Sequence, residues 1–532
     1  MSTSPTPPTA QSLAGEPRSS LGRWPWVTLG LAVVQLAVYW RTAAAGPLDV
    51  DAMVRWGAKV GPLITEAGEP WRLLTANFLH RDGLHVGFNL LVLVAAGAVL
   101  EGVWRRLDYG VLLGVAGLST MTCSLLWAEE VSVGASGMAY GCVGALIVVG
   151  RRYRAELSPT GRLMAGEGVL PTVLVFLWMG WTSAGVDNAG HLGGFGAGLL
   201  VALFTVPRRL GESEPQSVRL IRAGSVAAAG LVLAGLGVAG RSGWRVERDD
   251  VFGVTVAMPG SWRQGADKLG RVAFSNGLPG LGRASFAAQA IEAGEPGDGL
   301  PQATHFMEMA FSPEGMVLEG RPVKVWGPEP AWVSGGRAQQ VQARLEGPGG
   351  ATRLRAFFVP RGEFVYQLVF TWPEAFPQYA QVVQRMVTEL RLEEPALLRE
   401  ARARALLVPG PSEPLAMLGT ALRRWGRAEE ALEPLGEAVR LAPSQVSTRV
   451  ELARAFFESG HVEEGCRAAE EARVYGPSET AALEAGVRCE LARGNTGKAL
   501  VLLEEARRVD PLDARLRAAE TALRAAVEAA GH

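Results

Sequence analysis

Two residues of this chain have the types and the spacing that acyl-transfer chemistry requires. Ser136 lies at the start of an apolar stretch, and His191 lies 55 residues later at the start of another. A histidine can take the hydroxyl proton of a serine, whose oxygen then attacks a carbonyl carbon. Since ionisable residues are costly to place inside apolar spans and are usually functional there, we expect this pair to react at the ends of two membrane helices.

Glycines around the pair allow the two predicted helices to approach closely. Gly134 and Gly137 flank the serine, while Gly190, Gly194 and Gly198 recur at every fourth residue beside the histidine. A helix face without side chains permits close packing in membranes. The alternative for the serine alone is a packing role in such an interface. For the histidine alone, the alternative is a buried, hydrogen-bonded residue.

Four further residues are candidates for supporting roles. Tyr140 lies four residues after Ser136 and so shares its helix face, where it can lie beneath the imidazole; a core aromatic is the alternative. His85 and Asn89 also lie four apart, and both can donate hydrogen bonds to the negative oxygen of a tetrahedral intermediate. His80 is the fourth candidate. Three of the six histidines of the chain, His80, His85 and His191, thus lie at the ends of predicted spans.

Seven apolar segments near the length of a bilayer crossing must position these residues. They cover residues 24–40, 86–104, 109–128, 133–150, 168–185, 188–206 and 223–240. The tail and connections on one side of the predicted membrane region contain twelve basic residues, and the connections on the other side contain five. Because basic residues stay cytoplasmic, we expect the N-terminus inside and Ser136 and His191 near the outer face. If the seventh segment crosses, everything after residue 241 lies outside the cytoplasm; a buried or surface-lying helix is the alternative.

The bulk composition bounds the remaining functions. The 52 Lys and Arg residues balance 53 Asp and Glu residues, which gives no support for a nucleic-acid partner. The four cysteines show neither CxxC nor metal-ligand spacing, so we expect no disulfide framework, no metal site and no cofactor. Residues 1–22 are rich in Ser, Thr and Pro and are predicted to be a disordered tail without a signal peptide.

Residues 245–395 predict a soluble α+β domain. Several runs alternate with the period of two that half-buried strands have, and an amphipathic helix over about 376–391 follows them. These runs are Val251–Met258, Arg271–Ser275, Ala284–Ile291, Ala338–Leu345 and Phe364–Phe370. Through Gly253–Trp262 the domain resembles the PsbP/Mog1-like fold. His305 stands alone, which favours a solvated or structural histidine over a catalytic one.

Residues 396–532 predict a helical solenoid. Proline recurs with a period of 34 residues at Pro443, Pro477 and Pro511, and glycine does the same at Gly426, Gly460 and Gly494. This period, with glycine in the turn and proline at the end, is typical of tetratricopeptide repeats. A solenoid of this kind offers a concave surface to a partner protein, and a packing module without chemistry of its own is the plainer interpretation.

The region over roughly 24–206 resembles the rhomboid intramembrane serine proteases. The matching motifs are Trp71–Thr75, His80…His85…Asn89, Gly97…Glu101, Gly134-x-Ser136-Gly137…Tyr140 and His191…Gly194…Gly198. The resemblance implies a dyad of Ser136 and His191 without a carboxylate. It also implies an oxyanion hole made by His85, Asn89 and the backbone N–H of Ser136. Asp82 and Asp187 lie near these residues in the sequence, but we do not assign either to the dyad.

The predicted fold class is therefore a polytopic α-helical membrane domain over residues 23–240, rhomboid-like with six plus one spans, followed by the α+β domain and the solenoid. The resemblance implies an endopeptidase of the bacterial cytoplasmic (inner) membrane. Its expected substrates are transmembrane proteins of the lipid bilayer, cleaved in or near their spans. The alternative is a non-catalytic rhomboid-like scaffold that binds transmembrane helices. Such a scaffold is expected to lose the serine or the histidine, and this chain has both.

Overall fold

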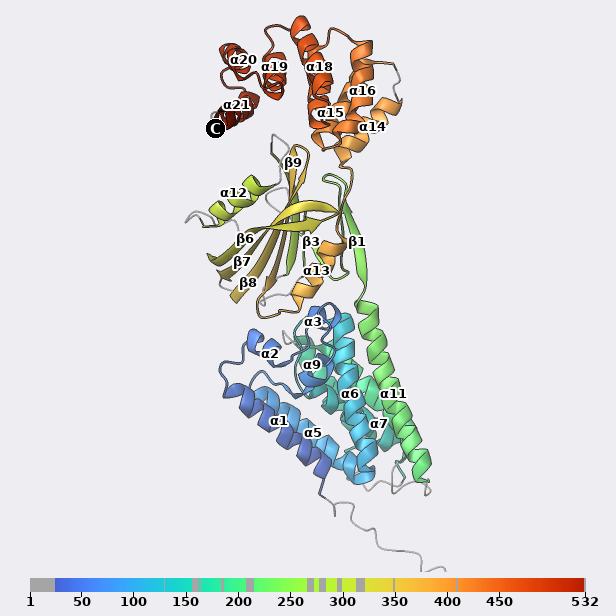
Figure 1. Ribbon diagram of the computed structural model, residues 1–532. Coiled ribbons are helices and arrows are strands. Elements are labelled where there is room, and N and C mark those ends of the chain that lie inside the picture. The colour runs from blue at the N-terminus through green and yellow to red at the C-terminus, as the bar shows by residue number, and fades with distance from the viewer. Residues whose placement is uncertain are drawn as a thin grey trace, which may run out of the picture. The chain divides into compact units, whose positions relative to one another are not determined.

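The chain folds as two compact units, Met1–Gly243 and Trp244–His532, which are described separately (Figure 1). The computed structural model describes residues 24–128, 130–155, 162, 164–182, 186–206, 215–265, 272–276, 284–293, 299–311, 321–347, 350–407 and 410–530. The tail predicted to be disordered, residues 1–22, lies outside the described residues.

The first unit is built from apolar helices. Its long helices are α1 (Trp26–Ala43), α5 (Gly83–Val103), α6 (Arg106–Trp127), α7 (Ser136–Arg152), α9 (Leu170–Thr182), α10 (Asn188–Phe204) and α11 (Gln216–Arg241). Each overlaps one of the seven predicted apolar segments. Among the described helices, α5, α6 and α11 are long and apolar enough to cross a membrane, and α10 is a shorter apolar helix.

The connection between α1 and α5 is a folded loop. It contains α2 (Val50–Trp56), α3 (Gly61–Thr65), α4 (Arg72–Thr75) and the 3-10 turn η1 (Ala76–Phe78), whereas η2 (Gly166–Val169) precedes α9. Arg72 is buried in this loop, where it pairs with Glu69 and donates to the carbonyl oxygens of Val54 at 2.7 Å and Ala58 at 3.1 Å. A guanidinium can satisfy several buried acceptors at once, so Arg72 holds the loop in one conformation.

Glycines set the distance between α7 and α10. A Cβ built on Gly194 would clash with the carbonyl oxygen of Gly137, and one built on Gly198 would clash with that of Gly141. The two backbones therefore touch along the stripe that the sequence predicts. Close backbone contact of this kind is a main source of helix association in membranes, where the hydrophobic effect does not drive it.

Replacing Gly198 with alanine is expected to separate these helices. The added methyl group meets backbone that cannot move aside, so we expect a loss of about 1–3 kcal/mol in stability. Thermal unfolding of the detergent-solubilised chain measures this loss. Gly196→Ala on the same helix is the matched control, because nothing lies within 4 Å of its added Cβ. Equal unfolding temperatures for the two variants would contradict the role assigned to Gly198.

The second unit begins with two antiparallel sheets. The larger has seven strands in the order β3-β4-β5-β9-β8-β7-β6, and the smaller has the order β1-β2-β10. The strands are β1 (Trp244–Asp249), β2 (Val254–Pro259), β3 (Arg263–Gly265), β4 (Val272–Ser275), β5 (Ser285–Glu292), β6 (Arg321–Val333), β7 (Gly336–Gly347), β8 (Gly350–Arg361), β9 (Phe364–Pro373) and β10 (Arg391–Leu392). Helices α12 (Leu300–Phe311) and α13 (Tyr379–Glu389) accompany them.

All five predicted strand runs overlap strands, although Arg271 lies outside the described residues. The run predicted over Val251–Met258 was wrong at its start. Residues 251–253 form the turn between β1 and β2, where Asp249 accepts a hydrogen bond from the Phe252 N–H and Gly253 has φ +68°. That positive φ ends an extended run and favours glycine. The predicted helix is also shorter than expected, because its last residues lead into β10.

Eight helices complete the second unit. They are α14 (Ala396–Leu407), α15 (Ser412–Arg424), α16 (Ala428–Leu441), α17 (Val446–Glu458), α18 (Val462–Tyr475), α19 (Thr480–Ala492), α20 (Thr496–Val509) and α21 (Ala514–Ala530). Gly426, Gly460 and Gly494 occupy the turns after α15, α17 and α19, with φ values of +83°, +85° and +76°. Positive φ favours glycine, which explains the 34-residue period of these glycines.

A disulfide links two successive helical hairpins, contrary to the expectation from cysteine spacing. Cys466 on α18 and Cys489 on α19 are bonded, with their Cα atoms 4.9 Å apart. Both side chains are buried. The expectation was wrong because the pairing depends on the packing of α18 against α19, and a separation of 23 residues matches no local motif.

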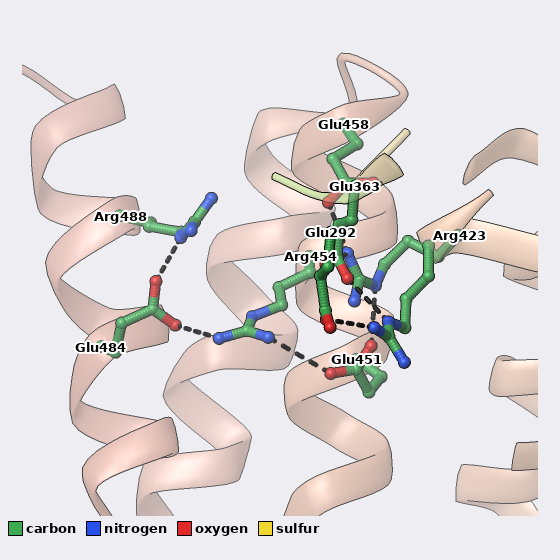
Figure 2. A network of polar contacts seen from close by, with 9 residues as sticks. Glu292, Glu363, Arg423, Glu451, Arg454, Glu458, Glu484 and Arg488 are labelled. Carbon is green, nitrogen blue, oxygen red and sulfur yellow. Dashed lines mark hydrogen bonds and ion pairs between the residues drawn. The ribbon is translucent and has the colours of Figure 1, made fainter. Parts of the chain in front are cut away.

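Buried charges join the larger sheet to the first helical hairpins (Figure 2). The Arg423 side chain on α15 is 2% exposed and pairs with Glu363 between β8 and β9 at 2.8 Å, and with Glu451 and Glu458 on α17, each at 2.7 Å. Figure 2 shows the network continuing through Arg454 to α19. Buried ions require partners of opposite charge, so this network couples the sheet to the helices.

Candidate active site

Helices α7 and α10 bring the serine and the histidine together. Ser136 is the first residue of α7, and its Oγ lies 2.9 Å from Nε2 of His191 in the first turn of α10. The His191 ring stacks on Tyr140, with ring centroids 4.4 Å apart and an interplanar angle of 15°. This stacking restricts the imidazole to an orientation in which Nε2 faces the hydroxyl. The geometry matches that of a nucleophile hydrogen-bonded to its base.

Two side-chain donors from α5 converge beside the serine. A Cβ built on Gly134 would lie 2.8 Å from His85 Nε2 and 3.2 Å from Asn89 Nδ2. Gly134 has φ +126°, a conformation that other residues rarely adopt. Asn89 Nδ2 is buried and has no hydrogen-bond partner among the described residues. A buried donor without a partner is available to a developing oxyanion, since an unmade hydrogen bond there is costly.

His80 contacts both the residue that precedes Ser136 and the ring of His85. Its side chain is fully buried, its Nε2 accepts a hydrogen bond from the Ala135 N–H at 3.4 Å, and its ring meets the His85 ring edge-on, with centroids 5.1 Å apart. Burial, with a contribution from His85, lowers the pKa of His80 to about 3. The ring is therefore neutral at neutral pH and can act as the acceptor that this contact requires.

Neither nearby aspartate contacts the imidazole. Asp82 caps α5 by accepting from the His85 N–H at 2.8 Å, and Asp187 caps α10 by accepting from the Gly190 N–H at 2.8 Å. His191 Nδ1 has no hydrogen-bond partner within the described part of the chain. Within the described residues, the imidazole is thus hydrogen-bonded to the serine and to neither aspartate. Ser132, which the sequence analysis did not single out, donates to Asp187 at 2.7 Å.

The dyad opens into a mostly apolar cavity of about 770 Å³. Its walls come from the loop between α1 and α5 and from α5, α6, α7, α9 and α10. Its lining includes Ser136, His191, His85, Asn89 and Tyr140. Within the described residues, no group of His, Cys, Asp and Glu side chains could hold a metal ion.

Comparison with known proteins locates this site within a known family. Residues 67–208 match the family model described as Rhomboid domain. The chain is 32% identical over 157 residues to Rhomboid protease GluP of Bacillus subtilis, covering 30% of each chain. It is 26% identical over 235 residues to Rhomboid protease AarA of Providencia stuartii, covering 37% of this chain and 79% of that one.

A third relative, RHOMBOID-like protein 5 of Arabidopsis thaliana, is 31% identical over 160 residues, which cover 28% of this chain and 50% of the relative. The matched region thus spans 30% of the length of GluP and half of the length of RHOMBOID-like protein 5. A solved structure titled as YrrB, a TPR protein with an unusual peptide-binding site, is 16% identical over 27% of this chain and 70% of that chain, with a TM-score of 0.22. The matched residues contain both Ser136 and His191, and residues 67–208 of this membrane protein are similar to a rhomboid domain.

Proposed function

We propose that this protein is an intramembrane serine endopeptidase that hydrolyses peptide bonds in or near the transmembrane segments of membrane-anchored proteins. The observation that carries the proposal is the 2.9 Å contact between Ser136 Oγ and His191 Nε2 inside the rhomboid domain. The unpartnered donor of Asn89 and the stacked ring of Tyr140 support it.

The chemistry proceeds in two halves. His191 Nε2 takes the hydroxyl proton as Ser136 Oγ attacks the scissile carbonyl, and a tetrahedral intermediate forms. His85, Asn89 and the backbone N–H of Ser136 donate to its negative oxygen. The imidazolium then gives its proton to the leaving amine, and the carbon–nitrogen bond breaks to leave an acyl-enzyme. Water, deprotonated by His191, attacks the ester and releases the new carboxylate, which restores the serine.

The substrate must present an accessible carbonyl to this dyad. A transmembrane helix hides its carbonyl groups in its own hydrogen bonds, and no water replaces them in the bilayer core. We therefore expect cleavage where helix-weakening or small residues allow the chain to unwind. The cavity of about 770 Å³ gives room for such an unwound segment beside the hydroxyl.

A serine-directed fluorophosphonate tests the proposal directly. The wild-type chain in detergent is expected to become labelled, because His191 activates Ser136 toward phosphorylation, whereas Ser136→Ala is expected to remain unlabelled. Ser124→Ala is the control, since Ser124 is a buried serine whose hydroxyl hydrogen-bonds to Ser132 and not to His191 among the described residues. Labelling that persists in Ser136→Ala, or a wild-type chain that neither labels nor cleaves a model transmembrane substrate, would instead favour the non-catalytic scaffold.

We further propose that the second unit lies outside the cytoplasm of a bacterial cell, where its repeats bind a protein partner. Two observations support this side of the membrane. Helix α11, which leads to the unit, is long and apolar enough to cross. The Cys466–Cys489 disulfide belongs to an oxidising compartment, because cytosolic thiols are kept reduced.

Thiol tagging tests this orientation. In a Cys123→Ser/Cys142→Ser background, cells are quenched with acid and denatured, and the protein is treated with a polyethylene glycol maleimide. We expect two tags on each chain after reduction and none without reduction, since the two remaining cysteines, Cys466 and Cys489, form a disulfide. A strain without its periplasmic thiol oxidase, in which unreduced protein should gain tags, is the control. Two tags without reduction in the normal strain would place the unit in the cytoplasm.

A further inference from the structure

A hydrogen bond outside the dyad ties together the two segments that carry it. Ser132 Oγ donates to Asp187 Oδ2 at 2.7 Å. Ser132 lies four residues before Ser136, and Asp187 lies four residues before His191. The bond thus joins two positions, each of which lies four residues before the reacting residue of its own segment.

On one side, the bond is attached to the first turn of α10. The Asp187 side chain caps this helix by accepting from the Gly190 N–H at 2.8 Å, and its carbonyl oxygen accepts from the His191 N–H at 3.0 Å. A capping residue fixes the direction in which its helix starts. The position of Asp187 therefore determines where the first turn, and with it the imidazole, is placed.

On the other side, the bond is attached to a fixed loop. The backbone of Ser132 pairs with that of Lys59, through N–H···O contacts of 3.0 and 3.2 Å. The Lys59 side chain is fully buried, and its Nζ donates to the carbonyl oxygens of Ala128 at 3.0 Å and Glu130 at 2.8 Å. Four hydrogen bonds to Lys59, two through its backbone and two through its side chain, thus hold the segment that leads into α7.

The glycine contacts between α7 and α10 lie on the opposite side of the dyad. They involve Gly137 and Gly141 against Gly194 and Gly198, all of which follow the reacting residues in their helices. The dyad is therefore held between two attachments, with backbone packing after it and the Ser132–Asp187 bond before it. Loss of the bond leaves the glycine packing in place, so the helices remain associated while their first turns gain freedom.

We propose that Ser132 and Asp187 are a positioning pair that sets the distance between Ser136 Oγ and His191 Nε2. This inference rests on the proposed function. Both residues line the cavity proposed for the substrate, but among the described residues neither side chain hydrogen-bonds to Ser136 Oγ or to the His191 ring. The pair acts by keeping the first turns of α7 and α10 in register. Effective reaction requires the reacting groups to be held in a narrow range of distance and orientation, and small displacements reduce the rate strongly.

Ser132→Ala is the decisive variant, because it removes the bond but leaves Asp187 free to cap α10. We expect kcat for a model transmembrane substrate to fall about 10- to 100-fold, with KM within about twofold. The rate of fluorophosphonate labelling should fall in parallel, since labelling needs the dyad but not the substrate site. Ser132→Thr keeps the hydroxyl and should restore kcat.

Ser124→Ala is the matched control. Ser124 Oγ contacts Ser132 Oγ at 2.9 Å and is equally buried, but the bond between Ser132 and Asp187 does not pass through it. We expect its kcat to stay within about twofold of the wild type. Asp187→Ala removes both the cap and the bond, and adding Ser132→Ala to it should cause no further loss.

The outcomes separate the pair from the proposed function. If the wild type cleaves in a Ser136-dependent way and Ser132→Ala is as fast, the positioning pair is overturned and the protease remains. Equal losses of kcat and unfolding temperature in Ser124→Ala and Ser132→Ala would show a general loss of loop stability and would also overturn it. Cleavage that does not depend on Ser136 overturns the proposed function and this inference together.

Discussion

Replacing either Ser136 or His191 with alanine is expected to reduce kcat by about 10⁴- to 10⁶-fold, and replacing both is expected to cost little more. The reason is that the serine and histidine act as one unit. Without the base, the hydroxyl keeps its proton, and without the hydroxyl, the base has nothing to activate. The measurement is single-turnover cleavage of a model transmembrane substrate by the purified variants, with substrate binding followed separately.

Two controls make this result specific to the dyad. Ser124→Ala changes a buried serine, and His305→Ala changes an exposed histidine on α12; both should keep full activity. Unfolding temperatures of the five variants should remain close, since the contact between Ser136 and His191 contributes one hydrogen bond to stability. If the fold-loss of kcat in the double variant were the product of the two single losses, Ser136 and His191 would act independently, contrary to the proposed mechanism.

Removing an oxyanion donor is expected to have the next largest effect. His85→Ala and Asn89→Ala should each lower kcat by about 10²- to 10³-fold with little change in KM, because their hydrogen bonds are made to charge that develops only in the transition state. Both donors lie beside Gly134 and line the same cavity as Ser136. Steady-state kinetics in detergent separates the two parameters.

Leu91→Ala is the matched control on the same helix. Leu91 lies on α5 two residues after Asn89, its side chain is exposed, and it is not among the residues that line the cavity. Its kcat should stay close to that of the wild type. If Asn89→Ala raised KM and left kcat unchanged, the side chain would serve substrate binding rather than the oxyanion.

Much of the candidate site could be predicted from the sequence, because its signals are local. The four-residue intervals between His85 and Asn89 and between Ser136 and Tyr140 define shared helix faces without any knowledge of the neighbours. The glycines beside His191 likewise mark a face that must contact another backbone. The structure brings these residues to one cavity, with the Tyr140 ring stacked on the imidazole as expected.

The interactions that the sequence did not reveal all join distant segments. The bond between Ser132 and Asp187 spans 55 residues, and the pair Arg423–Glu363 joins a helix to a turn between strands. The start of the strand predicted at Val251 was wrong for a related reason: hydrophobic alternation continued through a turn that the pairing of β1 with β2 imposes.

The sequence by itself predicted which residues have the chemistry to cleave a peptide bond, which segments are apolar enough to lie in a membrane, and the 34-residue period of the helical hairpins. These properties follow from residue type and from the short periods of helices. Only the tertiary structure decided that Asp187 pairs with Ser132, that Cys466 and Cys489 form a disulfide, and how closely α7 and α10 meet. Such outcomes depend on packing, which brings together side chains that no local period relates.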